Sequence, residues 1–106
     1  PSKAALVSLT EQVAIEWGPR GVRCNGVGPG LIPTPGTNNV YDTEAMREIR
    51  AKAVPLQRLG SPNDIAEAVC FLTSEQSAYI NGHILYVDGG LSKALMTLLP
   101  RPGDLG

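Results

Sequence analysis

Residues 25–34 read Asn-Gly-Val-Gly-Pro-Gly-Leu-Ile-Pro-Thr. They include the end of a short apolar run, residues 22–28, which suits a buried strand. Glycine lets the backbone approach a ligand closely, and Pro29 restricts the turn that follows the strand. Ligands of open α/β sheets bind beyond the carboxyl ends of the strands. The stretch therefore predicts a buried strand that leads into a ligand-contacting loop.

The rest of the chain alternates between helical and strand patterns. Apolar residues at spacings of three and four predict a first helix, and Ser61-Pro62 marks the start of a later one. A second continuous apolar run precedes the Asp88-Gly89-Gly90 turn. The predicted elements are helix 2–18, strand 22–28, a lid loop 29–42, helices 43–53 and 62–74, strand 83–87 and a tail 92–106.

Two buried strands that are joined through helices should run parallel. Two strands alone make too small a sheet to be covered in this way, so further strands are expected from elsewhere. The chain also begins at Pro1 with a helix already under way and without an initiator Met. We therefore expect an α/β fold, the C-terminal part of a doubly wound parallel sheet that is incomplete on its own.

Composition excludes several classes of partner. The chain has 106 residues, is 42% hydrophobic and carries a formal net charge of −1. This predicts a segment of one small domain with no nucleic-acid or membrane partner. Cys24 and Cys70 have no metal-ligand spacing, so we expect reduced, buried thiols, no metal and a cytoplasmic location.

Three motifs together resemble the C-terminal portion of a classical short-chain dehydrogenase/reductase, and in particular the 3-oxoacyl-carrier-protein reductases. They are Ser2-Lys3-Ala4-Ala5-Leu6, residues 25–34 and Tyr86-Val87-Asp88-Gly89-Gly90. The resemblance covers residues 2–91. It implies a Rossmann fold, NAD or NADP as cofactor, hydride transfer between nicotinamide and a carbonyl/alcohol substrate, and a homotetramer.

The same resemblance implies a catalytic role for Lys3. It matches the lysine of the family's Tyr-x-x-x-Lys motif, whose tyrosine would lie two residues upstream of Pro1. Residues four apart share a helix face, and an ammonium lowers the pKa of a neighbouring phenol. In the family this lysine also binds the cofactor ribose. The chain alone is expected to be inactive, with the upstream portion of the same enzyme as its partner.

The loop after the first strand resembles the family's cofactor-binding segment. By residue match, Pro29 and Gly30 shape the turn, the Ile32 backbone binds the nicotinamide carboxamide, and the Thr34 hydroxyl contacts the amide or the pyrophosphate. Gly28 replaces the Ala or Ser that is usual in the family, a departure that we expect to cost little. The Asp88-Gly89-Gly90 turn is expected to be structural.

Other residues have weaker claims to a role. Tyr41 lies in the predicted lid and is a candidate for substrate contact. His83 is expected to be structural or exposed, whereas Trp17 and Tyr86 are expected in the core or an interface. An alternative stays open, in which the protein is a non-catalytic relative that acts as a ligand-binding or assembly module.

Overall fold

The computed structural model describes residues 2–33 and 43–94. This part of the chain divides into two compact units. The first consists of Pro1–Gly28 and Asn63–Val87, and the second of Pro29–Pro62 and Asp88–Gly106.

The first helix, α1, spans Lys3–Trp17 and closely matches the predicted helix 2–18. Ser2 is its N-cap, because its hydroxyl oxygen accepts a hydrogen bond from the Ala5 amide at 3.1 Å. Gly18 closes the last turn by donating to the Ala14 carbonyl. A 3₁₀ turn, η1 (Gly18–Arg20), leads the chain away from the helix.

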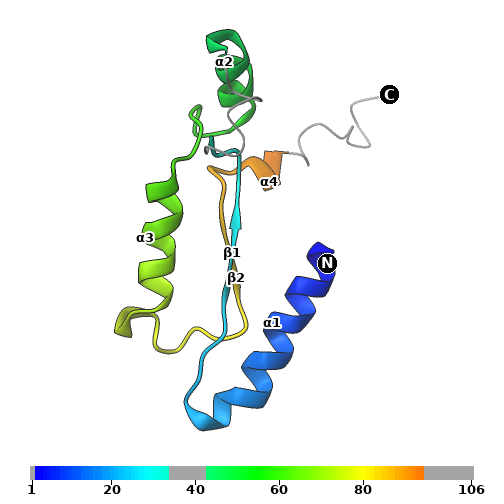
Figure 1. Ribbon diagram of the computed structural model, residues 1–106, viewed down its shortest axis with the longest axis vertical. Coiled ribbons are helices and arrows are strands. Elements are labelled where there is room, and N and C mark those ends of the chain that lie inside the picture. The colour runs from blue at the N-terminus through cyan, green and yellow to red at the C-terminus, as the bar shows by residue number, and fades with distance from the viewer. Residues whose placement is uncertain (1, 34–42, 95–106) are drawn as a thin grey trace, which may run out of the picture. The chain divides into compact units, whose positions relative to one another are not determined.

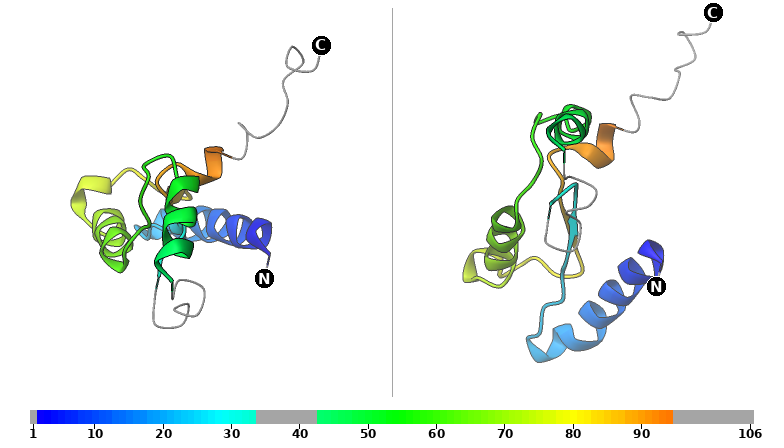
Figure 2. Two further views of the ribbon diagram at one scale, coloured as in Figure 1. Left: turned by 90° about the horizontal axis from the view of Figure 1, so that it is seen from above. Right: turned by 45° about the horizontal axis from the view of Figure 1, so that its top comes forward.

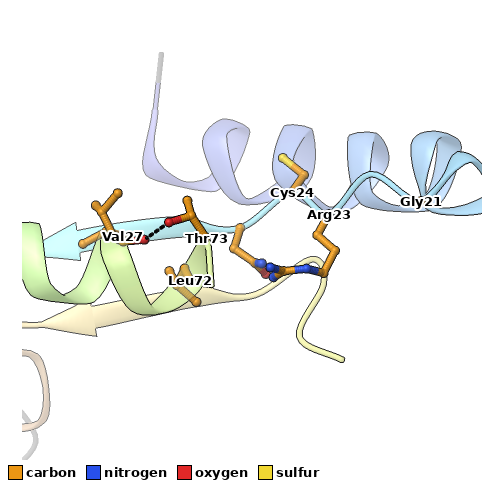
Figure 3. Close-up of a pocket in the computed structure, with 8 residues that line it drawn as sticks. Gly21, Arg23, Cys24, Val27, Leu72 and Thr73 are labelled. Carbon is orange, nitrogen blue, oxygen red and sulfur yellow. Dashed lines mark hydrogen bonds between the residues drawn. The ribbon is translucent and has the colours of Figure 1, made fainter. Parts of the chain in front are cut away.

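The sheet of the first unit pairs β1 (Gly26–Pro29) with β2 (Ile84–Val87). The two arrows point the same way in Figure 3, so the strands are parallel as predicted. Helices α1 and α3 (Pro62–Leu72) lie on opposite sides of this strand pair (Figures 1 and 2). The arrangement of helix, sheet and helix confirms the predicted α/β class.

The first strand is shorter than the predicted strand 22–28. Strand pairing begins only at Gly26, whose amide donates to the His83 carbonyl at 2.8 Å. Before it, the Cys24 amide donates to the Asn81 side-chain oxygen at 2.9 Å, and the His83 amide donates to the Asn25 side-chain oxygen at 3.0 Å. Side-chain amides thus satisfy backbone groups that a regular ladder would otherwise pair.

Helix α3 ends at Leu72, two residues before the predicted end at Ser74. The Thr73 hydroxyl donates to the Val69 carbonyl at 3.0 Å, and the Ser74 hydroxyl donates to the Phe71 carbonyl at 2.6 Å. Hydroxyl groups that bond to helical carbonyls offer the chain an alternative to another helical turn. A 3₁₀ turn, η3 (Glu75–Ser77), follows directly.

The second unit contains α2 (Glu44–Ala53) and the short α4 (Leu91–Ala94). Thr43 caps α2 by accepting a hydrogen bond from the Met46 amide at 3.1 Å. Helix α4 includes the first three residues of the predicted tail, 92–106. Pro29, the first residue of the predicted lid 29–42, belongs to β1, and residues 34–42 and 95–106 lie outside the described part.

The buried apolar residues among those described are Ala14, Leu72 and Val54. Several large apolar side chains of α1 are uncovered, with Leu9 60% and Ile15 70% exposed. In residues 2–33 and 43–94, no helix combines the length and apolar character needed to cross a membrane.

Candidate functional site

Lys3 lies in the first turn of α1, where Ser2 fixes the start of the helix. Its side chain is exposed, and Nζ lies over the ring of Tyr86 at 4.9 Å from the ring centroid. This distance is within the range of a cation–π contact. An ammonium has three N–H donors, and contact with one ring leaves donors for the hydroxyl groups of a ligand.

Tyr86 reaches Lys3 from β2 because the neighbouring strand has no side chain at Gly28. A Cβ at Gly28 would lie 2.6 Å from Cδ1 and 2.8 Å from Cε1 of the Tyr86 ring. The Tyr86 ring therefore occupies the space that a side chain at Gly28 would fill. The expectation that glycine merely replaces Ala or Ser at this position missed that fit.

The loop after β1 carries the other predicted cofactor residues in the second unit. A Cβ at Gly30 would lie 2.7 Å from Cα of Asp88, so only glycine fits against that backbone. The Leu31 carbonyl accepts a hydrogen bond from the Gly60 amide at 3.0 Å. Pro29 is the last residue of β1, and Gly30 and Ile32 follow it in a loop that contacts Asp88 and Gly60. Ile32 is partly buried in this loop.

Asp88 orders the turn after β2. Its carboxylate accepts hydrogen bonds from the Gly90 amide at 2.9 Å and the Ser92 amide at 3.1 Å. Burial acts to raise the pKa of this carboxyl, but the hydrogen bonds from Ser92 and Gly90 outweigh it, and the net pKa is lowered from its ordinary value. All of these bonds are local to the turn, which supports the structural role expected for Asp88-Gly89-Gly90.

A groove of about 490 Å³ lies in the first unit beside the segment that leads into β1. Figure 3 shows Arg23, Cys24, Val27 and Leu72 among the residues that line it. The Arg23 guanidinium donates to the carbonyls of Ile80 and Ser74, both at 3.2 Å. These bonds join the segment before β1 to residues on either side of η3, which gives the Arg23 charge a structural role.

Several predicted residues have a plainer outcome. Thr34 and Tyr41 lie outside the described residues. His83 is exposed, which is one of the two expectations stated for it. Trp17 is 46% and Tyr86 40% exposed, so neither lies in the core and the interface is the expectation that remains for both. Cys24 and Cys70 are both free thiols, as predicted, but the expected burial is wrong, because Cys24 is only partly buried and Cys70 is exposed.

Sequence reasoning also missed three polar residues, Arg23, Asn25 and Asn81, whose side chains link segments that are far apart in the sequence. The Asn25 side chain donates to the Ile80 carbonyl at 3.0 Å, and the Asn81 side chain donates to the Ala14 carbonyl at 3.1 Å. Their signal in the sequence was an arginine and an asparagine within an otherwise apolar run and an asparagine in a turn. Such residues are common in exposed positions, so the signal was weak.

Comparison with known proteins agrees with this arrangement. The family model described as enoyl-(acyl carrier protein) reductase matches residues 1–92. The chain therefore belongs to this family of short-chain dehydrogenases/reductases, and its fold is a part of the doubly wound Rossmann sheet.

Individual relatives have different substrates in their names. The L-rhamnose 1-dehydrogenase (NAD(P)(+)) of Azotobacter vinelandii is 45% identical over 91 residues, which cover 86% of this chain and 36% of that protein. The 3-oxoacyl-[acyl-carrier-protein] reductase of Thermotoga maritima is 39% identical, with 85% of this chain and 36% of that protein covered. The structure of 4-hydroxyisoleucine dehydrogenase complexed with NADH matches with a TM-score of 0.79 and 33% identity, over 86% of this chain and 37% of that one.

The chain spans about a third of the length of the curated relatives that it matches. Lys3 and the loop after β1 lie within the matched range. The remaining two thirds of those relatives have no counterpart in the 106 residues.

Proposed function

We propose that this chain is the C-terminal part of an oxidoreductase that uses NAD or NADP to interconvert a carbonyl and an alcohol. The observation that carries the proposal is Lys3, which is exposed in the first turn of α1. By residue match, we assign to it the role of the family's catalytic lysine. The substrate is a small molecule of the carbonyl/alcohol class. The relatives act on a sugar, an acyl thioester and an amino acid by their names, so the proposal extends no further than this class.

The nicotinamide, when bound, supplies or accepts the hydride. Lys3 would donate hydrogen bonds to the ribose hydroxyls and, by its charge, lower the pKa of a tyrosine hydroxyl one helical turn upstream. The Ile32 backbone would bind the nicotinamide carboxamide, with Pro29 and Gly30 shaping the turn and the Thr34 hydroxyl binding the amide or the pyrophosphate. Tyr41 would contact the substrate. The tight fit of Gly30 against Asp88 supports a loop of fixed shape.

The proposed assembly is a homotetramer in the cytoplasm, in which the upstream portion of the same enzyme completes the domain. The exposed apolar side chains of α1 and α3 support it, because large uncovered apolar patches mark interaction surfaces. They include Leu6, Leu9, Ile15, Val69 and Phe71. The two thiols are consistent with a reducing compartment.

The test is made on the intact protein that contains this chain, with NADH or NADPH and a panel of small ketones and aldehydes. Lys3→Ala should lower kcat by about 10²- to 10⁴-fold, the usual effect of losing positioned acid–base catalysis. Lys52→Ala is the matched control, because this exposed lysine lies in the last turn of α2 and has no proposed role. It should leave kcat unchanged.

Two results would overturn the proposal. One is an intact protein that binds neither cofactor, which would favour a ligand-binding or assembly module. The other is a Lys3→Ala variant whose turnover equals that of Lys52→Ala. Sedimentation of the same preparation tests the assembly, since a monomer at micromolar concentration contradicts the homotetramer.

A further inference from the structure

The contact between Lys3 and Tyr86 joins the start of α1 to the third residue of β2. The Lys3 ammonium lies 4.9 Å from the centroid of the Tyr86 ring. The negative face of an aromatic ring attracts a cation within about 6 Å. Lys3 is the central candidate residue of the site, and its side chain therefore has Tyr86 as a partner.

The position of Lys3 makes that partner important. The N-terminus of a helix carries partial positive charge, which disfavours a cation there. The first turn of α1 holds no acidic residue that could offset this effect. An aromatic face is a neutral group that attracts the ammonium without forming an ion pair that would compete with a ligand.

The ring itself is held by the strand beside it. Tyr86 occupies the space where a Cβ of Gly28 would lie, 2.6 Å from Cδ1 and 2.8 Å from Cε1. The ring is 40% exposed, so one part packs on β1 while another remains open to solvent and to the ammonium. Gly28, Tyr86 and Lys3 form a connected series in which the glycine seats the ring and the ring faces the lysine.

We propose that Tyr86 is a positioning residue for Lys3. The ring limits the conformations of a flexible four-carbon side chain and orients its remaining N–H donors for cofactor hydroxyls. This inference rests on the proposed role of Lys3 in an NAD(P)-dependent enzyme. It assigns to Tyr86 no contact with the substrate or with the reacting atoms.

The test is a double-mutant cycle in the intact protein, with the dissociation constant of NADH or NADPH and kcat as readouts. Tyr86→Leu should weaken cofactor binding and lower kcat by about two- to tenfold, the range expected for losing one cation–π contact. Tyr86→Phe keeps the ring face and should behave like the wild type. In a Lys3→Ala background, Tyr86→Leu should have no further effect, because the residue that it positions is gone.

A merely structural role would give a different pattern. Tyr86→Leu would then weaken cofactor binding by the same factor in the wild type and in the Lys3→Ala background. Tyr86→Phe could also bind the cofactor more weakly than the wild type does. That pattern, or a Tyr86→Leu variant with unchanged affinity and kcat, would overturn the inference. Melting temperatures of all variants identify any that are unfolded.

A separate readout detects the contact without cofactor or turnover. The ring current of Tyr86 should shift the NMR signals of the Lys3 Cε protons, and the shift should persist in Tyr86→Phe and vanish in Tyr86→Leu. Absence of the shift in the wild type overturns the inference even in an active enzyme. A shift in a protein that binds no cofactor overturns the proposed function and, with it, the positioning role.

Discussion

An added Cβ would approach a neighbouring side chain to the same distance at Gly28 and at Gly89, but the neighbour is exposed at Gly28 and buried at Gly89. A Cβ at Gly28 would lie 2.6 Å from Cδ1 of Tyr86, and a Cβ at Gly89 would lie 2.6 Å from Cγ1 of Val54. Tyr86 is 40% exposed and its ring can turn aside, whereas Val54 is 3% exposed and enclosed. Gly89 also has a φ of 63°, in the left-handed region. The cost of an added methyl group thus depends on the freedom of its neighbour more than on the distance.

The largest effect is expected at Gly89. Gly89→Ala should lower the free energy of unfolding of the intact protein by about 2–4 kcal/mol, because strain at positive φ adds to overpacking against Val54. Chemical denaturation measures the loss. If Gly89→Ala lowers the free energy of unfolding by less than Gly21→Ala does, Val54 must move aside as easily as an exposed ring.

Removing the Asp88 charge should have the next largest effect. Asp88→Asn should cost about 1–2 kcal/mol at neutral pH, since charge-assisted hydrogen bonds to the turn amides become neutral ones. The pKa of Asp88 is lowered in the folded protein, so its contribution is fully present above the ordinary value of 3.8 and is lost as the pH falls through the lower folded value. Denaturation from neutral to strongly acidic pH should show the wild type and the variant converging, and a constant difference would contradict this origin.

Gly21 separates strain from crowding. It has a φ of 80° like a left-handed turn residue, yet nothing lies within 4 Å of an added Cβ. Gly21→Ala should therefore cost only the conformational strain, about 1 kcal/mol. The difference between the denaturation midpoints of Gly21→Ala and Gly89→Ala measures the loss of stability that the contact with Val54 adds.

The smallest change in stability is expected at Gly28. Gly28→Ala should cost less than about 1 kcal/mol, because the exposed Tyr86 ring can rotate away. The same rotation should remove the ring from Lys3 and weaken cofactor binding about two- to tenfold. In a Tyr86→Ala background the methyl group has room, so Gly28→Ala should leave affinity unchanged. A large loss of stability would instead show that the ring is locked in place.

Local patterns predicted the helices well and the strand lead-in poorly. The α1 and α2 boundaries follow from Ser2, Thr43 and periodic apolar residues, all of which act within a turn or two of the chain. Residues 22–25 read as a strand because they are apolar on average, but the partner of the Cys24 amide is Asn81, 57 residues away. No pattern within the run reveals a partner at that distance.

The candidate site shows the same difference between features that local sequence patterns predict and contacts that depend on distant residues. Lys3 and Gly30 are identified by motif, whereas the contact of Lys3 with Tyr86 depends on how α1 and β2 come together. Tyr86 lies in the continuous apolar run Ile84–Val87, which made the core or an interface the natural expectation. Only the absence of a side chain at Gly28, on the adjacent strand, explains why the ring is where it is.

The polar side chains around β1 also bear on the order in which the chain folds. Hydrogen bonds from Arg23, Cys24 and Asn25 and to the Asn25 side chain span between 51 and 58 residues. Closing a loop of that length loses chain entropy, so we expect these bonds to form after the intervening helices. The amides of Cys24 and His83 should therefore exchange with deuterium together, through one shared opening, while the first turn of α1 exchanges earlier by fraying.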